Sequence, residues 1–176
     1  DQDASDAMAD AGFYRLFVPE QLGGLEASPV VSAQIFERLA QGSAACGWVA
    51  FIAATSGSTL GSVPEETARA IFTHPNTMVA GVFAPSGKAR VDAGQVTVNG
   101  RWQWGSGTQN ADWVLGGCLV DTGDEKPSQH MVLMPTSEIH FLDTWHVSGL
   151  QGTGSTDYEA VDLSLSDGHI VGYGGH

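Results

Sequence analysis

Apolar positions in the first part of the chain recur with the spacing of a helix. Val31 and every fourth residue after it up to Leu39 are apolar, which places them on one face of a helix. Ser28 is a suitable N-cap and Pro29 suits a first helical turn, so the pattern predicts a helix over 28–41.

Three further segments have helical patterns. Gly12 is well placed to end a short helix, and Pro75 to end another. Between them, a stretch that follows Ser43 is almost entirely small or apolar, so we expect a helix buried on most sides. The three predicted helices cover residues 3–11, 44–55 and 64–72. The first 75 residues are therefore predicted to be helical.

Beyond residue 76 the hydrophobic period shortens to about two residues, which is typical of strands. Asp92-Ala93-Gly94 and Asn99-Gly100 predict two tight hairpin turns. The predicted strands cover residues 78–83, 89–91, 95–98, 101–104, 113–120, 131–134, 139–142 and 158–165. Helices followed by strands predict an α+β fold, with a helical domain over 1–75 and an antiparallel β-sandwich or barrel over 76–176.

Charge and composition narrow the classes of partner. The 176 residues include 7 Lys and Arg against 20 Asp and Glu, a net charge of -13, which disfavours nucleic acid and anionic membranes. The longest uninterrupted apolar stretch, 46–54, is too short to span a bilayer. Cys46 and Cys118 form no disulfide framework, so we expect a soluble protein of the cytoplasm. The chain begins at Asp1 without Met, and we treat it as a possible fragment.

Several common chemistries have no matching motif. The glycines do not form a G-x-x-x-x-G-K-[ST] or a G-x-G-x-x-G loop, and no G-x-S-x-G elbow is present. The six histidines and two cysteines lack the spacing of metal ligands, so no metal site is predicted.

The most unusual local sequence runs from Asn99 to Trp113 and contains three tryptophans. Trp102 and Trp104, two residues apart, would share one face of a strand, and the Gly-Ser-Gly that follows lets a flat group approach the backbone. An aromatic cofactor would suit such a surface. The simpler interpretation is that these tryptophans pack a sandwich core and the glycines make a turn.

The same run resembles the middle-domain segment N-G-x-K-x-W-I-T-N-x-x-x-A-x-W of the acyl-CoA dehydrogenase superfamily. Other segments are similar too: residues 11–24 resemble A-G-x-x-x-x-x-V-P-E-x-x-G-G, residues 28–47 fit the next helices, and residues 81–87 lie where the family has its T-E-P-x-x-G-S flavin loop. Residues 145–157 resemble W-x-x-x-G-x-x-G-T-x-S-x-D. The resemblance covers nearly the whole chain.

The resemblance implies a flavin site. In the family, an aromatic residue and a hydroxyl residue two places on lie against the isoalloxazine ring, and these positions hold Trp104 and Ser106 here. It implies that the Ser106 hydroxyl or backbone N–H bonds near the flavin N5 and O4, which makes Ser106 the candidate catalytic residue. The implied cofactor is FAD or FMN. The implied cofactor-binding residues are Val82, Phe83, Pro85, Ser86, Trp104, Gly105 and Ser106.

Two departures favour one branch of the superfamily. The flavin loop reads Phe-Ala-Pro-Ser-Gly-Lys over 83–88, and Gly-Ser-Gly over 105–107 replaces I-T-N. Both resemble the two-component monooxygenases, which use reduced flavin to hydroxylate an aromatic or heterocyclic substrate. This branch implies a flavin reductase as partner. An FAD-dependent acyl-CoA dehydrogenase, oxidising an acyl thioester, is the alternative.

Family members continue into a C-terminal four-helix bundle that completes the flavin site and forms the tetramer, and this chain stops at residue 176, before it. The resemblance thus implies a homo-oligomer, a dimer or tetramer, for a full-length form. It leaves open a third possibility, an incomplete structural fragment that binds no flavin.

Overall fold

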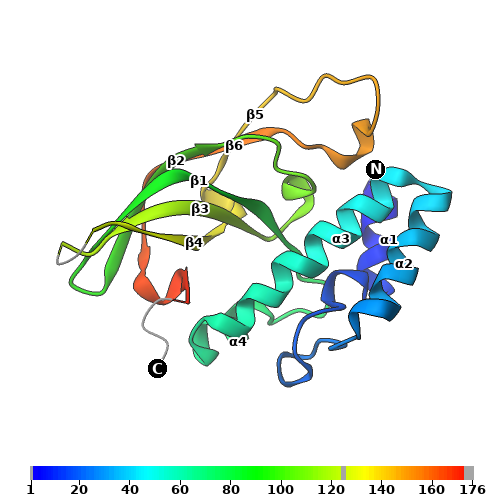
Figure 1. Cartoon of the computed structure of the whole chain (residues 1–176), viewed down its shortest axis with the longest axis horizontal. Helices are drawn as coiled ribbons and strands as arrows, with labels where there is room; N and C mark the ends of the chain where they lie inside the picture. The colour runs from blue at the N-terminus through cyan, green and yellow to red at the C-terminus, as the bar shows by residue number, and fades with distance from the viewer. Residues whose placement is uncertain (1, 124–125, 173–176) are drawn as a thin grey trace.

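The computed structural model describes residues 2–123 and 126–172, in which helices are followed by one sheet (Figure 1). The helices are α1 (Gln2–Asp10), α2 (Pro29–Gly42), α3 (Ala44–Ser58) and α4 (Glu65–Ile71). The strands are β1 (Val79–Asp92), β2 (Gln95–Trp102), β3 (Trp113–Asp121), β4 (Ser128–Pro135), β5 (His140–Leu142), β6 (Asp157–Ser166) and β7 (Ile170–Val171). The α+β prediction is confirmed.

Local capping explains where the helices begin and end. The Ser28 side chain accepts a hydrogen bond of 3.3 Å from the backbone N–H of Val31, and Pro29 occupies the first turn of α2, as predicted. Ser43 caps α3 in the same way, through the N–H of Cys46. Gly12, with φ at 76°, follows α1 in the left-handed region, where its lack of a Cβ avoids strain.

Helix α3 is less buried than its composition predicts. It packs closely against α2, since a Cβ on Gly47 would lie 2.7 Å from the Ala40 Cβ. Trp48, and Phe51 beside Phe36 of α2, remain 45% and 38% exposed, so one stripe of the helix stays open, although seven of its fifteen residues are buried. The helical stretch from Ala44 to Ser62 has 19 residues and a mean hydropathy of 1.2, which by length and composition alone is enough to cross a bilayer, and 44% of that stretch is buried within the protein. Composition therefore does not separate this helix from a membrane span, although such partial burial also occurs in core helices.

The strands form a single seven-stranded sheet in the order β5-β6-β2-β1-β3-β4-β7. Among the described strands five pairings are antiparallel, as predicted, and the central pairing of β1 with β3 is parallel. The helices lie to one side of this sheet, and the connection from β2 to β3 passes between the two (Figure 1).

One predicted turn is present and the other is absent. Ala93 and Gly94, with φ of 48° and 79°, form the two-residue turn between β1 and β2. Asn99 and Gly100 lie inside β2, where the register with β6 shifts between Val98 and Gly100. The predicted hairpin at Asn99-Gly100 is therefore wrong, and this segment is an irregularity in one continuous strand.

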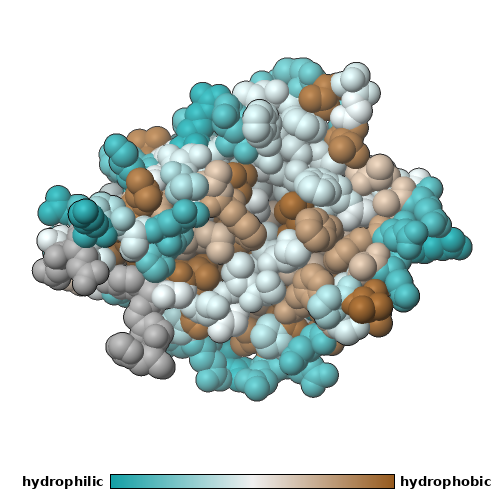
Figure 2. All heavy atoms as spheres, viewed as in Figure 1, coloured by the Kyte–Doolittle hydropathy of each residue, from teal (hydrophilic) through white to brown (hydrophobic). Residues whose placement is uncertain are grey.

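Helices and sheet share one core. Met8, Tyr14 and Ala53 from the helical part belong to the same buried cluster as Trp102 and Tyr158 from the sheet. Residues of intermediate and high hydropathy also gather across the middle of the face shown in Figure 2. The helical part ends before β1, near the predicted boundary at residue 75, and the division into two domains stays a prediction.

Candidate functional site

Trp104 has an unusual backbone conformation. Strand β2 ends at Trp102, which is fully buried, whereas Trp104 has φ at 63° and is 70% exposed. The sequence predicted that the two tryptophans share one face of a strand. That prediction is wrong, because Trp104 lies beyond the end of β2. A bulky residue in the left-handed region is strained and persists only where its surroundings hold it there.

Asp157 holds this conformation from the start of β6. Its Oδ1 accepts the backbone N–H of Trp104 at 3.3 Å, and its Oδ2 accepts two hydrogen bonds from the Arg101 guanidinium at 2.8 and 3.2 Å. Burial raises the pKa of this carboxyl, but the hydrogen bonds from Arg101, from Trp104 and from Thr144 outweigh it, so the net pKa is below the ordinary value. Asp157 is thus an ionised, buried anchor of the segment that carries Trp104.

The residues after Trp104 lie along the segment that leads into β6. The N–H of Gly105 donates to the Thr156 carbonyl, and the N–H of Gly107 donates to the Thr153 carbonyl, both at 2.9 Å. A Cβ on Gly105 would lie 2.7 Å from the ring of Tyr158. Glycine at 105 therefore permits a close approach that a larger residue would prevent.

Ser106 is buried, and its backbone N–H and its hydroxyl both have hydrogen-bond partners within the protein. Its backbone N–H bonds to the Trp104 carbonyl at 2.9 Å. Its hydroxyl accepts the Trp48 indole N–H at 2.9 Å and lies 2.7 Å from the Ser155 hydroxyl. The backbone N–H of Ser106 is therefore not free for a ligand. A contact between Ser106 and a flavin stays a prediction, and the hydroxyl is the group that would make it.

The predicted flavin loop forms a bulge in β1. Val82 is opposite Gly116 of β3 and Gly87 is opposite Cys118, so residues 83–86 bulge over Gly117 alone. A Cβ on Gly117 would lie 2.3 Å from the Phe83 carbonyl oxygen, which explains the glycine there. Phe83 is 47% exposed, and Pro85 and Ser86 are exposed beside it.

Tyr158 connects the two predicted segments. Its hydroxyl accepts the backbone N–H of Val82 at 3.1 Å and donates to the Leu115 carbonyl, while its ring lies against Gly105. Phe83, however, lines a hollow with residues of β4 and β7, and Trp104 does not line that hollow. The side chain of Tyr158 thus contacts both Val82 and Gly105. Among the described contacts, none joins Phe83 to Trp104.

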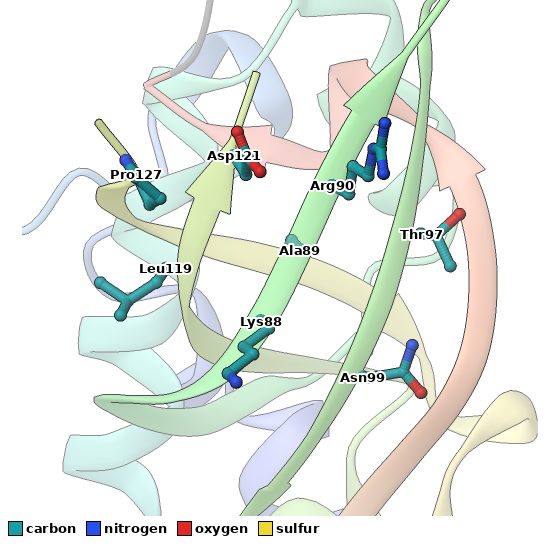
Figure 3. Close-up of a pocket in the computed structure, with 8 residues that line it drawn as sticks. All are labelled: Lys88, Ala89, Arg90, Thr97, Asn99, Leu119, Asp121 and Pro127. Carbon is teal, nitrogen blue, oxygen red and sulfur yellow. The ribbon is translucent and has the colours of Figure 1, made fainter. Parts of the chain in front are cut away.

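A separate hollow of about 560 Å3 opens on the outer face of β1, β2 and β3 (Figure 3). Its lining includes two cations on β1, Lys88 and Arg90, and none of the predicted site residues. The eight lining residues are Lys88, Ala89, Arg90, Thr97, Asn99, Leu119, Asp121 and Pro127. Across residues 2–123 and 126–172, no group of three His, Cys, Asp or Glu side chains is placed to hold a metal.

Four residues near Trp104 were not predicted. Trp48 lies in a helix that the sequence assigned to the core, and Arg101 and Asp157 pair across 56 positions. Ser155 lies in a hydroxyl-rich stretch, 153–156, within the segment 145–157 that resembles a family segment. The hydroxyl stretch and the match of 145–157 to a family segment were the available signals.

Residues 1–70 match the family described as "Acyl-CoA dehydrogenase, N-terminal domain". Residues 1–70 therefore carry the N-terminal domain of an acyl-CoA dehydrogenase, and the fold of nearly the whole chain is similar to the first part of related solved structures.

The similar proteins are flavin enzymes. The chain is 34% identical over 167 residues to indole-3-acetate monooxygenase of Pseudomonas putida, covering 94% of the chain and 43% of the relative. It is 30% identical over 174 residues to the flavin-dependent monooxygenase oxygenase subunit HsaA of Rhodococcus jostii, covering 97% and 45%. The crystal structure of HsaA monooxygenase from M. tuberculosis matches with a TM-score of 0.90 at 30% identity, covering 97% of this chain and 47% of that one. The chain thus spans less than half the length of these relatives.

Proposed function

We propose that this chain is the flavin-holding N-terminal and middle part of the oxygenase component of a two-component, flavin-dependent monooxygenase. The observation that carries the proposal is Trp104, whose exposed indole is fixed on a strained backbone beside a buried hydroxyl. Relatives of about 30% identity carry monooxygenase names, which supports the same assignment.

The residues fit a flavin on one side of its ring. The indole of Trp104, 70% exposed, offers a flat apolar surface for stacking, and the Ser106 hydroxyl is a polar contact two residues on. Reduced flavin, when bound, supplies the electrons that activate dioxygen. The protein's part is to orient the ring and to exclude water from it. In this proposal the loop residues Val82, Phe83, Pro85 and Ser86 complete the protein surface near the flavin.

The substrate is proposed to be aromatic or heterocyclic. Relatives are named for indole-3-acetate and for resorcinol, both aromatic compounds. Either FAD or FMN is compatible with the proposal, since similar folds are described with FADH2 and with FMN.

A flavin reductase is the proposed protein partner, because relatives are named oxygenase subunits or components. We also propose a cytoplasmic homo-oligomer, supported by the exposed apolar residues Val30, Trp48 and Phe51 on α2 and α3. Light scattering of the purified protein gives the oligomeric state, and a monomer at all concentrations would contradict that part.

Anaerobic titration with reduced and oxidised FAD and FMN tests the proposal. We expect saturable binding that quenches tryptophan fluorescence, with much less quenching in Trp104→Phe than in a Trp145→Phe control. After oxygen is admitted, an aromatic substrate should gain a hydroxyl group. Binding of oxidised FAD that an acyl-CoA bleaches would instead support the dehydrogenase alternative, and absence of any flavin binding would support a flavin-free fragment.

A further inference from the structure

Four hydrogen bonds connect the helical part to the segment before β6. The Trp48 indole N–H bonds to Ser106 Oγ at 2.9 Å, and Ser106 Oγ lies 2.7 Å from Ser155 Oγ. Ser155 Oγ lies 2.6 Å from Thr153 Oγ1, which bonds to the Leu150 carbonyl at 2.9 Å. We call the three linked hydroxyls, of Ser106, Ser155 and Thr153, the hydroxyl chain.

The two ends of the hydroxyl chain determine the direction of every proton in it. The Leu150 carbonyl can only accept, and beside the Thr153 N–H at 3.0 Å and the Trp145 indole N–H at 3.3 Å it accepts the single hydroxyl proton of Thr153. Ser155 must then donate to Thr153, and Ser106 must donate to Ser155. The Trp48 indole N–H can only donate, and it does so to Ser106.

Burial keeps this direction from being reset by water. Ser106, Ser155 and Thr153 are exposed by only 8%, 3% and 2%. A buried hydroxyl that lost its acceptor would leave a polar group unsatisfied, which is costly. Ser106 has therefore committed its proton inward and retains one lone pair, so toward a ligand it can accept a hydrogen bond but cannot donate one.

We propose that Thr153 and Ser155 are positioning residues that make Ser106 an acceptor and so give the site a preference for reduced over oxidised flavin. This inference rests on the proposed function, which places a flavin ring at Trp104 and Ser106. Reduction adds an N–H to the ring at position 5, where the oxidised ring has only a lone pair. The N–H of the reduced ring can therefore donate a hydrogen bond to the Ser106 hydroxyl oxygen. In the oxidised ring the lone pair of the nitrogen would face a lone pair of Ser106, and the two repel each other.

Thr153→Val tests the direction, because it removes the acceptor that orients Ser155. Ser155 then donates to Ser106, whose own proton becomes available to a ligand. We expect the ratio of the dissociation constant of oxidised FMN to that of reduced FMN to fall at least about tenfold in anaerobic titrations of the whole protein. Thr136→Val is the matched control, since Thr136 Oγ1 is buried without a hydrogen-bond partner among the described residues, and it should leave the ratio unchanged.

The other end of the network separates positioning from general structural support. Trp48→Phe removes a donor to Ser106 but leaves the hydroxyl chain and its direction intact, so the preference for reduced FMN should persist. A merely structural role predicts similar ratios in both variants. If flavin binds and Thr153→Val keeps the wild-type ratio, this inference is overturned while the proposed function stands. If the wild-type protein binds neither form of FMN or FAD, the proposed function fails and this inference fails with it.

Discussion

The backbone N–H of Trp104 donates to the Asp157 carboxylate at 3.3 Å, and this contact joins the end of β2 to the start of β6 across 53 positions. The same carboxylate pairs with Arg101, so one buried side chain satisfies a strained backbone and a cation together. The exposed indole therefore depends on a residue far away in the sequence.

Asp157→Asn keeps the shape of this anchor and removes its charge. Because the side chain is buried and accepts charge-assisted hydrogen bonds, we expect the free energy of unfolding to fall by about 1–3 kcal/mol in urea titrations. Asp143→Asn, at a side chain 91% exposed, is the control and should change it by less than about 0.5 kcal/mol. Equal effects at the two sites would refute the anchoring role.

The lowered pKa of Asp157 gives a direction for the dependence of stability on pH. In the unfolded chain Asp157 takes up its proton near its ordinary pKa of about 3.9, and in the folded protein only at lower pH. Its stabilisation is therefore complete above the unfolded pKa and is lost as pH falls through the folded pKa. Below about pH 4 the difference in unfolding free energy between wild type and Asp157→Asn should shrink, which urea titrations at several pH values measure. A difference that grows on acidification would contradict this assignment.

The two free thiols should differ in reactivity. Cys118 is fully buried in β3, and burial raises the pKa of its thiol to about 12, whereas Cys46 is only partly buried on α3. An aromatic disulfide reagent at pH 8 should therefore label about one thiol per native chain rapidly and the second only after unfolding. Cys46→Ser should abolish the rapid phase. Two rapid phases in the native protein would show that β3 opens readily.

Helix ends were predictable because their determinants are local. Ser28, Pro29 and Gly12 act within a few residues of themselves, and each takes the role that its position in the pattern predicts. Strand pairing is different. A period of two is the same in parallel and antiparallel strands, so the parallel contact between β1 and β3 left no signal in the pattern.

The candidate site was predictable as a segment but not as a geometry. The tryptophan-rich run and the family resemblance pointed to Trp104 and Ser106, yet period-two reasoning placed Trp104 beside Trp102 on one strand face. The structure ends β2 two residues earlier, since Asp157 holds Trp104 in the left-handed region. Contacts of that sequence separation are absent from any local pattern.

Gly117→Ala should disturb the bulge of β1. Its Cβ would lie 2.3 Å from the Phe83 carbonyl oxygen and 2.4 Å from that of Ala84, so the backbone of one strand must move. We expect a loss of about 1–3 kcal/mol in unfolding free energy, typical of overpacking, and weaker flavin binding. Gly94→Ala is the comparison variant. It adds a Cβ at a residue of positive φ in a turn where no atom lies within 4 Å, so it measures backbone strain without a clash. If Gly117→Ala is as stable as wild type and binds flavin unchanged, the bulge does not shape the site.

Replacing the two neighbouring tryptophans should have opposite consequences for stability and binding. Trp104→Gly removes an indole that is 70% exposed and relieves a positive φ. The relieved strain and the greater freedom of glycine in the unfolded chain nearly cancel, so the free energy of unfolding should stay within about 1 kcal/mol of wild type. Flavin affinity should fall at least about tenfold, because the stacking surface is lost.

Trp102→Ala is the counterpart. This side chain is fully buried, stacks on Tyr158 with ring centroids 5.3 Å apart and donates to the Gly117 carbonyl at 2.8 Å. Its removal should cost about 3–5 kcal/mol of unfolding free energy. If Trp104→Gly destabilises the protein to a similar extent, Trp104 is a packing residue. If it leaves both stability and flavin binding unchanged, strain at this position has no role in ligand binding.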